Sequence, residues 1–317
     1  MQADRTRRAI IFAVVVPAFC FALPASSNAQ WVPNPGEGTV SVGYQYTRIA
    51  DHLFSQSVDG LVDPATGYVG GPGNRYYMGD IFGQTVNVSA DYGVWRGLAV
   101  SAGAAYVSSM YSGRFVEGPK DDGKYHGNLQ DATLGVQYML PWKEFAITPS
   151  VGVRVPITNY NTLGHVSVGK HLREFPIGIS VGRSLDPLLP RAYLAGSFAY
   201  SFVQHHHEHN IDQRHYELDA GYVLRKSISV GGTLQYVSTV GGIDWFTDDL
   251  SGAEMWSDHD AAAKTRYLRA GGLLSFSFGR GVGLGISYLG TLSGANTHAG
   301  QSLMVAPSWG FGKAIAR

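Results

Sequence analysis

A histidine-rich run is the sharpest chemical feature of this sequence. It reads His205-His206-His207-Glu208-His209. Imidazole and carboxylate groups are ligands for zinc, copper and nickel, so His205, His207 and His209 are candidate metal ligands. Neighbouring residues in a flexible loop do not form a site in advance, however. A solvated loop is therefore the favoured interpretation, and a metal site is the alternative.

A second segment, residues 243–264, mixes acids with large apolar side chains, and Lys264 is its only lysine or arginine. Such a segment can fold inward and constrict an opening, or attract cations or a sugar to its rings. An ordinary acidic surface loop is favoured, because long loops are generally solvated. The acids and apolar side chains are Asp244, Asp248, Asp249, Glu254, Asp258, Asp260, Trp245, Phe246, Met255 and Trp256.

Serine and histidine together raise the question of a lipid hydrolase. That chemistry needs a serine nucleophile beside a histidine base, on a sharp turn from a strand into a helix. The chain has 11 histidines, but most fall in expected loops. We expect no nucleophile elbow of the Gly-x-Ser-x-Gly kind, and therefore no enzyme.

The elements that must position these residues are strands. Apolar and polar or small residues alternate in twelve stretches, as they do in strands that cross a bilayer. These stretches are residues 38–48, 86–94, 98–106, 132–140, 145–157, 175–181, 194–202, 216–224, 228–236, 268–278, 282–288 and 303–311. Tyrosines near the strand ends are expected to form aromatic girdles. The pattern predicts an all-β, closed antiparallel up-and-down transmembrane barrel.

The connections fall into two length classes. Short links are expected at residues 96–97, 141–144, 186–191, 225–227 and 279–281, and long links at 51–80, 113–126, 158–171, 204–214, 241–266 and 291–300. Five short and six long links are what twelve up-and-down strands require. Outer-membrane barrels have short turns in the periplasm and long loops outside. Both termini are therefore expected in the periplasm.

Charged residues on the expected inward face are the candidates for solute selection. They are Asp91, Asp131, Arg154, Glu217, Asp219 and Arg269. Opposed acids and bases could set a field across the lumen that selects solutes. Alternatively they pair with one another inside a filled barrel, and both interpretations remain open.

The N-terminus has the pattern of a secretory signal peptide, residues 1–29, with a basic start, a short apolar run and cleavage after Ala29. Cys20 is the only cysteine and lies within this signal, so the mature chain is expected to contain none. The 24 basic and 24 acidic residues become 21 and 23 once Arg5, Arg7, Arg8 and Asp4 are removed. That balance argues against nucleic acid as a partner.

Several stretches resemble a family of outer-membrane transporters, grouped loosely with barrels named after the meta-pathway of phenol degradation. The stretches are "PGEGTVSVGYQYTRIADHLF", "DYGVWRGLAVSAGAAYV", "DDGKYHGNLQDATLGVQYML" and "GRSLDPLLPRAYLAGSFAYSFV". The resemblance covers most of the mature chain. It implies a barrel transporter, and it brings no substrate or site residue with it.

We therefore expect a signal peptide, a barrel over residues 30–312 and a short tail at 313–317. The main hypothesis is an outer-membrane channel for small solutes, passive or selective. The alternatives are a closed structural or binding barrel that acts through its outer loops and, more remotely, the hydrolase. Expected partners are outer-membrane lipid, a small solute and the barrel assembly machinery during insertion. We expect no cofactor.

Overall fold

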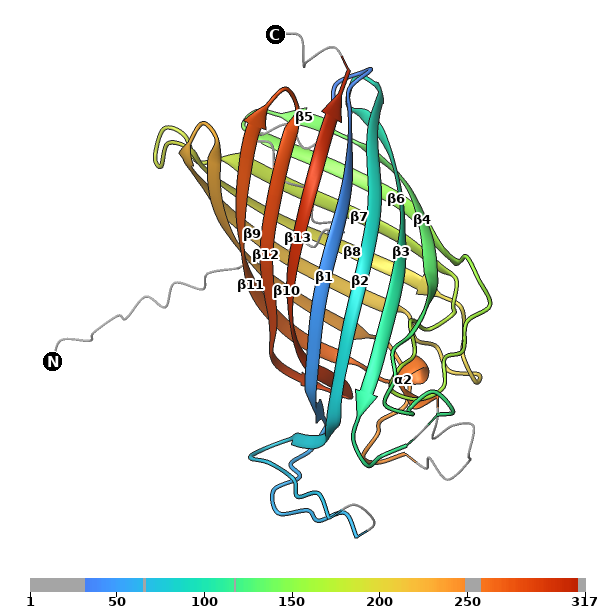
Figure 1. The fold of residues 1–317 in the computed structure, drawn as a ribbon. Coiled ribbons are helices and arrows are strands. Elements are labelled where there is room, and N and C mark those ends of the chain that lie inside the picture. Colours follow the sequence, from blue (N-terminus) through green and yellow to red (C-terminus); the bar gives the residue numbers. More distant parts are fainter. Residues whose placement is uncertain (1–31, 65–66, 117, 249–257, 313–317) are drawn as a thin grey trace, which may run out of the picture.

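The computed structural model describes residues 32–64, 67–116, 118–248 and 258–312. These residues form an all-β antiparallel barrel (Figure 1). The expected signal peptide, residues 1–29, and the expected tail, residues 313–317, lie outside the described residues. Among the described residues, the structure contains no helix with the length and apolar character that a membrane crossing requires.

The strands follow one another along the chain with little else between them. They are β1 (Gly38–Leu53), β2 (Arg75–Trp95), β3 (Leu98–Ser112), β4 (His126–Tyr138), β5 (Leu140–Trp142), β6 (Phe145–Pro156), β7 (Glu174–Ser184), β8 (Ala192–Val203), β9 (Gln213–Arg225), β10 (Ile228–Thr239), β11 (Arg266–Gly279), β12 (Val282–Ala295) and β13 (Thr297–Phe311). A short helix, α2 (His259–Ala262), lies between β10 and β11.

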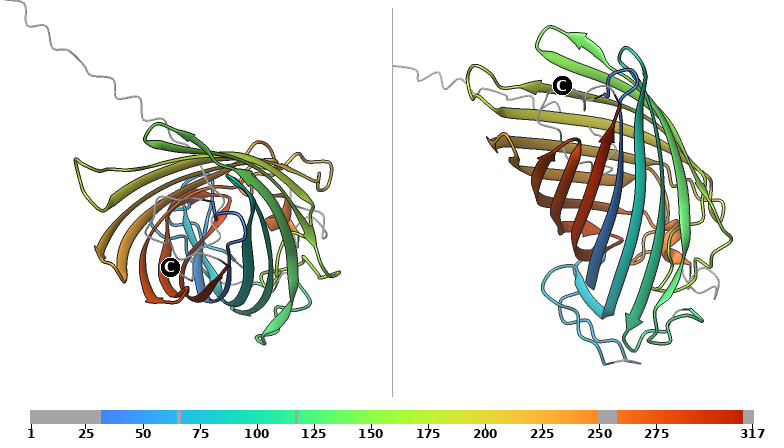
Figure 2. Two further views of the ribbon diagram at one scale, coloured as in Figure 1. Left: turned by 90° about the horizontal axis from the view of Figure 1, so that it is seen from above. Right: turned by 45° about the horizontal axis from the view of Figure 1, so that its top comes forward.

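The sheet closes on itself. Apart from β4 and β5, each strand pairs with its neighbours in the chain, and β1 pairs with both β2 and β13, so that Gly38 lies opposite Phe311. β4 and β5 pair with successive parts of β6 and are separated only by Met139. They therefore form one interrupted strand, and the closed ring has twelve strands. Figure 2 shows this ring from above. The predicted twelve-stranded closed barrel is confirmed.

The two faces of the wall differ as the alternation predicts. Outward side chains are apolar and exposed: Tyr44 is 47% exposed and Val88 is also 47% exposed. Inward side chains at alternating positions are polar and covered, and the hydroxyls of Ser41 and Ser89 lie 2.7 Å apart on neighbouring strands. Exposure of so many apolar side chains to water would cost free energy, whereas in a bilayer the same side chains contact lipid. The wall is therefore built to stand in a membrane.

The long loops gather at one end of the barrel and the short turns at the other (Figure 1). The prediction of a long link at residues 291–300 is wrong, because β12 and β13 continue to Ala295 and Thr297 and only Asn296 joins them. Asn296 has a φ of 48°, in the left-handed region that asparagine tolerates better than most residues. The remaining long links form loops over residues 54–74, 113–125, 157–173, 204–212 and 240–265.

Candidate transport pathway and its cap

Loops from different sides of the ring meet over the long-loop end of the barrel. His165, in loop 157–173, lies 5.6 Å from His52 near the end of β1, measured between ring centroids. Loop 157–173 joins β6 to β7, which stand four and five strands away from β1 around the ring. Contact between His165 and His52 therefore requires this loop to reach across the mouth. We use the term cap for the described residues of loops 157–173 and 240–265.

Histidines from three elements form the centre of the cap. The Nε2 atoms of His52 in β1 and His298 in β13 lie 2.8 Å apart. The carboxylate of Asp260 in α2 lies 3.6 Å from His298 Nε2 and 3.3 Å from the Nε2 atom of His259. Trp245 is buried against them, with its ring centroid 4.9 Å from that of His259 and 5.7 Å from that of His298. The wall and the cap thus share one polar and aromatic interface.

A second contact joins loop 157–173 to loop 113–125. His165 stacks on Tyr111, with a centroid distance of 4.1 Å and an interplanar angle of 6°. Its Nδ1 atom lies 3.0 Å from Asp121 Oδ2, and neither side chain is exposed. Breaking a buried pair of this kind leaves a polar group without compensation, which costs far more than an exposed pair would. The pair therefore fixes the position from which His165 reaches His52.

Asn296 ties the tight β12–β13 turn to the cap. Its Oδ1 atom accepts a hydrogen bond from the backbone N–H of Trp245 at 3.2 Å, and its Nδ2 atom donates one to the Lys264 carbonyl at 3.2 Å. The side chain is almost completely buried. No feature of the sequence predicts this role, because an asparagine in a stretch with glycine and threonine is typical of an ordinary solvated loop.

The structure folds the acidic-aromatic segment inward. Trp245, Asp258 and the alanines of α2 are buried. Ser55 donates a hydrogen bond to Asp244 at 2.7 Å, so loop 54–74 is joined to this segment as well. The expectation of an ordinary solvated loop is therefore wrong for the buried residues, whereas Phe246 and Asp248 are exposed as it predicts. Asp249, Glu254, Met255 and Trp256 lie outside the described residues.

Three of the predicted inward charges lie together on β9 to β11. Glu217 stands opposite Gln235, which stands opposite Arg269, and Asp219 is two residues from Glu217 on the same face of β9. Glu217 is buried and accepts hydrogen bonds from Thr233 at 3.0 Å and Gln235 at 3.3 Å. The Arg269 guanidinium lies 4.3 Å from the Tyr267 ring centroid.

A second group lies on β4 to β7. Arg154 pairs with Glu174 at 3.1 Å, and Asp131 accepts a hydrogen bond from Tyr160 at 2.7 Å. Sequence reasoning missed Glu174, although it continues the polar face of β7 two residues before Pro176. Asp91, the remaining candidate, is buried near the short-turn end and lies apart from both groups. The six predicted charges therefore form two groups and one separate residue.

Two histidines of the run contact Asp258, a residue of the acidic-aromatic segment 243–264. His206 Nε2 lies 2.6 Å and His207 Nε2 lies 3.5 Å from Asp258 Oδ2, which precedes α2. Burial alone would raise the pKa of Asp258, but hydrogen bonds from His206 and Thr162 outweigh it, and the pKa is lowered. Among the described residues, the group with metal-binding geometry is His206, His207 and Asp258. The predicted trio of His205, His207 and His209 shares only His207 with it.

Residues 178–182 do have the Gly-x-Ser-x-Gly spacing of a nucleophile elbow. The nucleophile of such an elbow stands on a sharp turn between a strand and a helix. Ser180 instead lies in the middle of β7, which continues to Ser184, and its hydroxyl faces the Thr148 carbonyl at 3.5 Å. The spacing is therefore a product of strand alternation with glycine.

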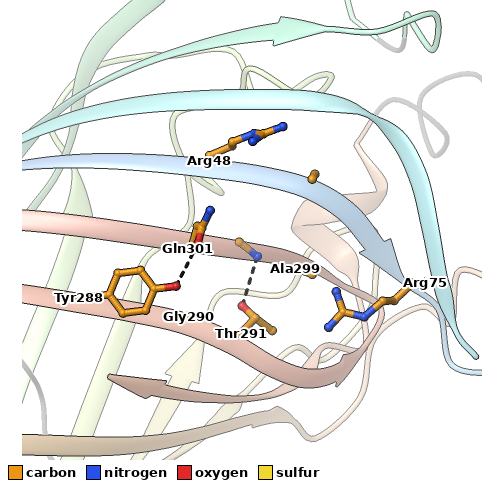
Figure 3. Close-up of a pocket in the computed structure, with 9 residues that line it drawn as sticks. Arg48, Arg75, Tyr288, Gly290, Thr291, Ala299 and Gln301 are labelled. Carbon is orange, nitrogen blue, oxygen red and sulfur yellow. Dashed lines mark hydrogen bonds between the residues drawn. The ribbon is translucent and has the colours of Figure 1, made fainter. Parts of the chain in front are cut away.

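A hollow of about 250 Å³ lies on the outer wall near the long-loop end (Figure 3). It is lined by Arg48, Arg75, Tyr288 and Gln301, together with small residues of β1, β12 and β13. Both arginines are already paired, Arg48 with Asp80 at 3.0 Å and Arg75 with Asp51 at 3.1 Å. Tyr288 donates a hydrogen bond to Gln301 at 2.9 Å. The hollow therefore lies on the outer face of the wall and not in the lumen.

Solved structures with the same architecture exist. An outer-membrane channel from Pseudomonas putida F1 matches with a TM-score of 0.64 and 12% identity, over 88% of this chain and 97% of that one. The β domain of the Bordetella autotransporter BrkA matches at 0.47 and 11%, over 87% and 100%. The KdgM porin in complex with disordered oligogalacturonate matches at 0.46 and 8%, over 86% and 99%. Neither a protein-family model nor a curated protein matches the chain.

At 12% identity the likeness to the Pseudomonas putida channel shows the fold alone. The fold of the Pseudomonas putida channel agrees with the outer-membrane barrel that the sequence resemblance implies. The grouping with phenol-degradation barrels stays a prediction.

Proposed function

We propose that this chain is an outer-membrane channel for small solutes, with a mouth that the cap closes in the conformation described above. The observation that carries the proposal is the combination of a closed wall, apolar outside and polar inside, with a cap made of loops. Loops can rearrange without breaking the hydrogen-bonded ring of strands, so a cap made of loops can open while the barrel stays intact. The Pseudomonas putida protein that shares the fold is itself named an outer-membrane channel.

The charges of the inner wall favour cations. Four of the six predicted lumen residues are acids, and Glu174 adds a carboxylate beside Arg154. Rings or rows of carboxylates attract cations and repel anions in a narrow aqueous path. We therefore propose that the channel prefers cations and that its short turns lie in the periplasm.

Planar-bilayer recording tests the proposal. We expect discrete conductance steps after insertion, and a reversal potential under a potassium chloride gradient whose sign indicates cation preference. A correctly folded barrel that inserts and stays electrically silent, at all voltages and with the cap loosened by substitution, would contradict it.

A closed barrel that acts through its outer loops is the second candidate. The cap favours it, because buried contacts such as that between His165 and Asp121 are built to persist. A silent, folded barrel in the bilayer experiment is the result that this candidate predicts.

A further inference from the structure

A reverse turn brings two imidazoles of loop 204–212 to the same place. The backbone N–H of His206 donates to the His209 carbonyl at 3.2 Å, and the N–H of His209 donates back at 2.9 Å. His207 and Glu208 between them have φ values of 46° and 69°. Two successive positive φ angles are typical of a type I′ turn, which usually contains asparagine and glycine. The turn holds the His206 and His207 rings with centroids 4.3 Å apart.

The third member of the group comes from another loop, 51 and 52 residues further along the chain. Both imidazole Nε2 atoms face the same oxygen, Asp258 Oδ2, at 2.6 Å and 3.5 Å. The three ligand atoms all lie within 4.8 Å of one another. The Asp258 side chain is only 7% exposed, while His206 and His207 are 17% and 33% exposed. The cluster is thus anchored on the inside and accessible from one side.

We propose that His206 Nε2, His207 Nε2 and Asp258 Oδ2 bind a divalent transition-metal ion of the zinc class. Imidazole and carboxylate form the mixed donor set that suits zinc and its neighbours. Ligand atoms around tetrahedral zinc lie roughly 3.3 Å apart, as bond lengths near 2.0–2.1 Å require. The 3.5 Å contact already fits this spacing, and the 2.6 Å contact reaches it by a small rotation of the His206 or Asp258 side chain. Water would complete the coordination.

Hydrogen bonding alone explains only part of this geometry. His206 is at hydrogen-bond distance from the carboxylate, but 3.5 Å is too long for a good hydrogen bond from His207 to the same oxygen. An ion between the three atoms would contact His207 Nε2 as well as His206 Nε2 and Asp258 Oδ2.

The metal would join the two loops that it bridges. Asp258 directly precedes α2, whose His259 packs against Trp245 in the cap. An ion held between loop 204–212 and Asp258 would therefore hold the start of α2, which is part of the cap. This inference does not depend on conduction, because a closed structural barrel could hold the same ion.

Zinc titration of the purified, tag-free full-length mature barrel tests the proposal. We expect isothermal titration calorimetry to show one equivalent of zinc bound with micromolar or tighter affinity. The double variant His206→Ala/His207→Ala should bind that equivalent at least about tenfold more weakly, since loss of direct ligands exceeds the effect of losing supporting groups. The matched control is His205→Ala/His209→Ala, which removes two histidines from the same run and should bind as the parent does.

Asp258→Asn separates loss of the site from loss of folding. It nearly preserves the shape of the side chain and should also weaken zinc binding at least about tenfold. Zinc should slow hydrogen exchange in residues 204–212 and 258–262 of the parent and of the control, but not in the ligand variants. The proposal is overturned by the absence of micromolar binding in the parent. It is equally overturned if the ligand variants bind as the parent does, or if the control loses as much affinity as they do.

Discussion

Asn296 has one role through its backbone and another through its side chain, and substitutions can separate the two. It occupies the left-handed conformation that joins β12 to β13, and it hydrogen-bonds Trp245 and Lys264 of the cap. Asn296→Ala should destabilise the cap by about 3 kcal/mol, because it loses the side-chain hydrogen bonds to Trp245, Lys264 and Asp244 and has a less tolerant backbone. We expect faster trypsin cleavage after Lys264 in the folded barrel, and more frequent conductance steps.

The control for this prediction is Asn296→Gly. Glycine adopts positive φ without steric cost, so this variant loses only the hydrogen bonds and should be less affected than alanine. Equal cleavage rates for the two variants would mean that the turn conformation contributes nothing to holding the cap.

Charges of the inner wall give opposite predictions for two substitutions. Glu217→Gln removes a buried carboxylate from the row on β9 to β11 and should shift the reversal potential toward anion preference. Arg154→Gln removes the partner of Glu174 and should shift it toward stronger cation preference. The measurement is the reversal potential in a potassium chloride gradient. Shifts of the same sign would show that these residues act on the shape of the pathway and not through their charge.

At the scale of elements, the strands could be predicted because the bilayer imposes a period of two on them. The twelve predicted stretches lie on strands of the barrel, but several strands are longer than predicted at the long-loop end. The prediction began the second strand at Val86, whereas β2 begins at Arg75. Beyond the bilayer, both faces of a strand meet water or loops, so the apolar alternation disappears while the hydrogen-bonded ladder continues. The same effect hid the turn at Asn296.

The contact between Ser55 and Asp244 joins two elements and should depend on pH. Burial raises the pKa of Asp244, but the hydrogen bonds from Ser55, the Phe246 N–H and Asn296 outweigh it, so the pKa is lowered. A carboxyl with a lowered pKa contributes stability that is complete above its unfolded value of about 3.9. That contribution is lost as pH falls through the lower folded value.

We therefore expect loop 240–265 to become more open to an acid protease such as pepsin as the pH falls below about 4. Asp244→Asn keeps the shape but not the charge, and should make the cleavage rate less dependent on pH over that range. Ser55→Ala should have a smaller effect of the same kind, because it removes one of several donors. An unchanged pH profile in Asp244→Asn would contradict this assignment.

At the scale of the whole molecule, the candidate site was the part that sequence could not assemble. The inward charges followed from strand parity, but their partners did not: Glu174 lies one residue before the predicted start of its strand. Contacts between loops have no periodicity at all. Nothing in the sequence links His52 to His165 or Asp258 to His206, because these pairs join residues that are far apart in the chain and lie in elements without a shared periodicity.

The membrane setting of the whole barrel can be tested with two adjacent residues on β2. Val88 is 47% exposed on the outer face, and Asn87 faces inward between Gly43 and Ala105 on the neighbouring strands. An arginine that faces lipid costs about 2–4 kcal/mol near the bilayer midplane and about 0–1 kcal/mol near its surfaces. Val88→Arg should therefore lower the free energy of unfolding from lipid vesicles by about 2–4 kcal/mol.

Asn87→Arg is the control. It lies at the same depth and should change the free energy of unfolding little, because the small residues around it leave room and the inner face is polar. Equal losses for both variants would mean that the two faces meet similar surroundings, which a barrel standing in a bilayer does not allow.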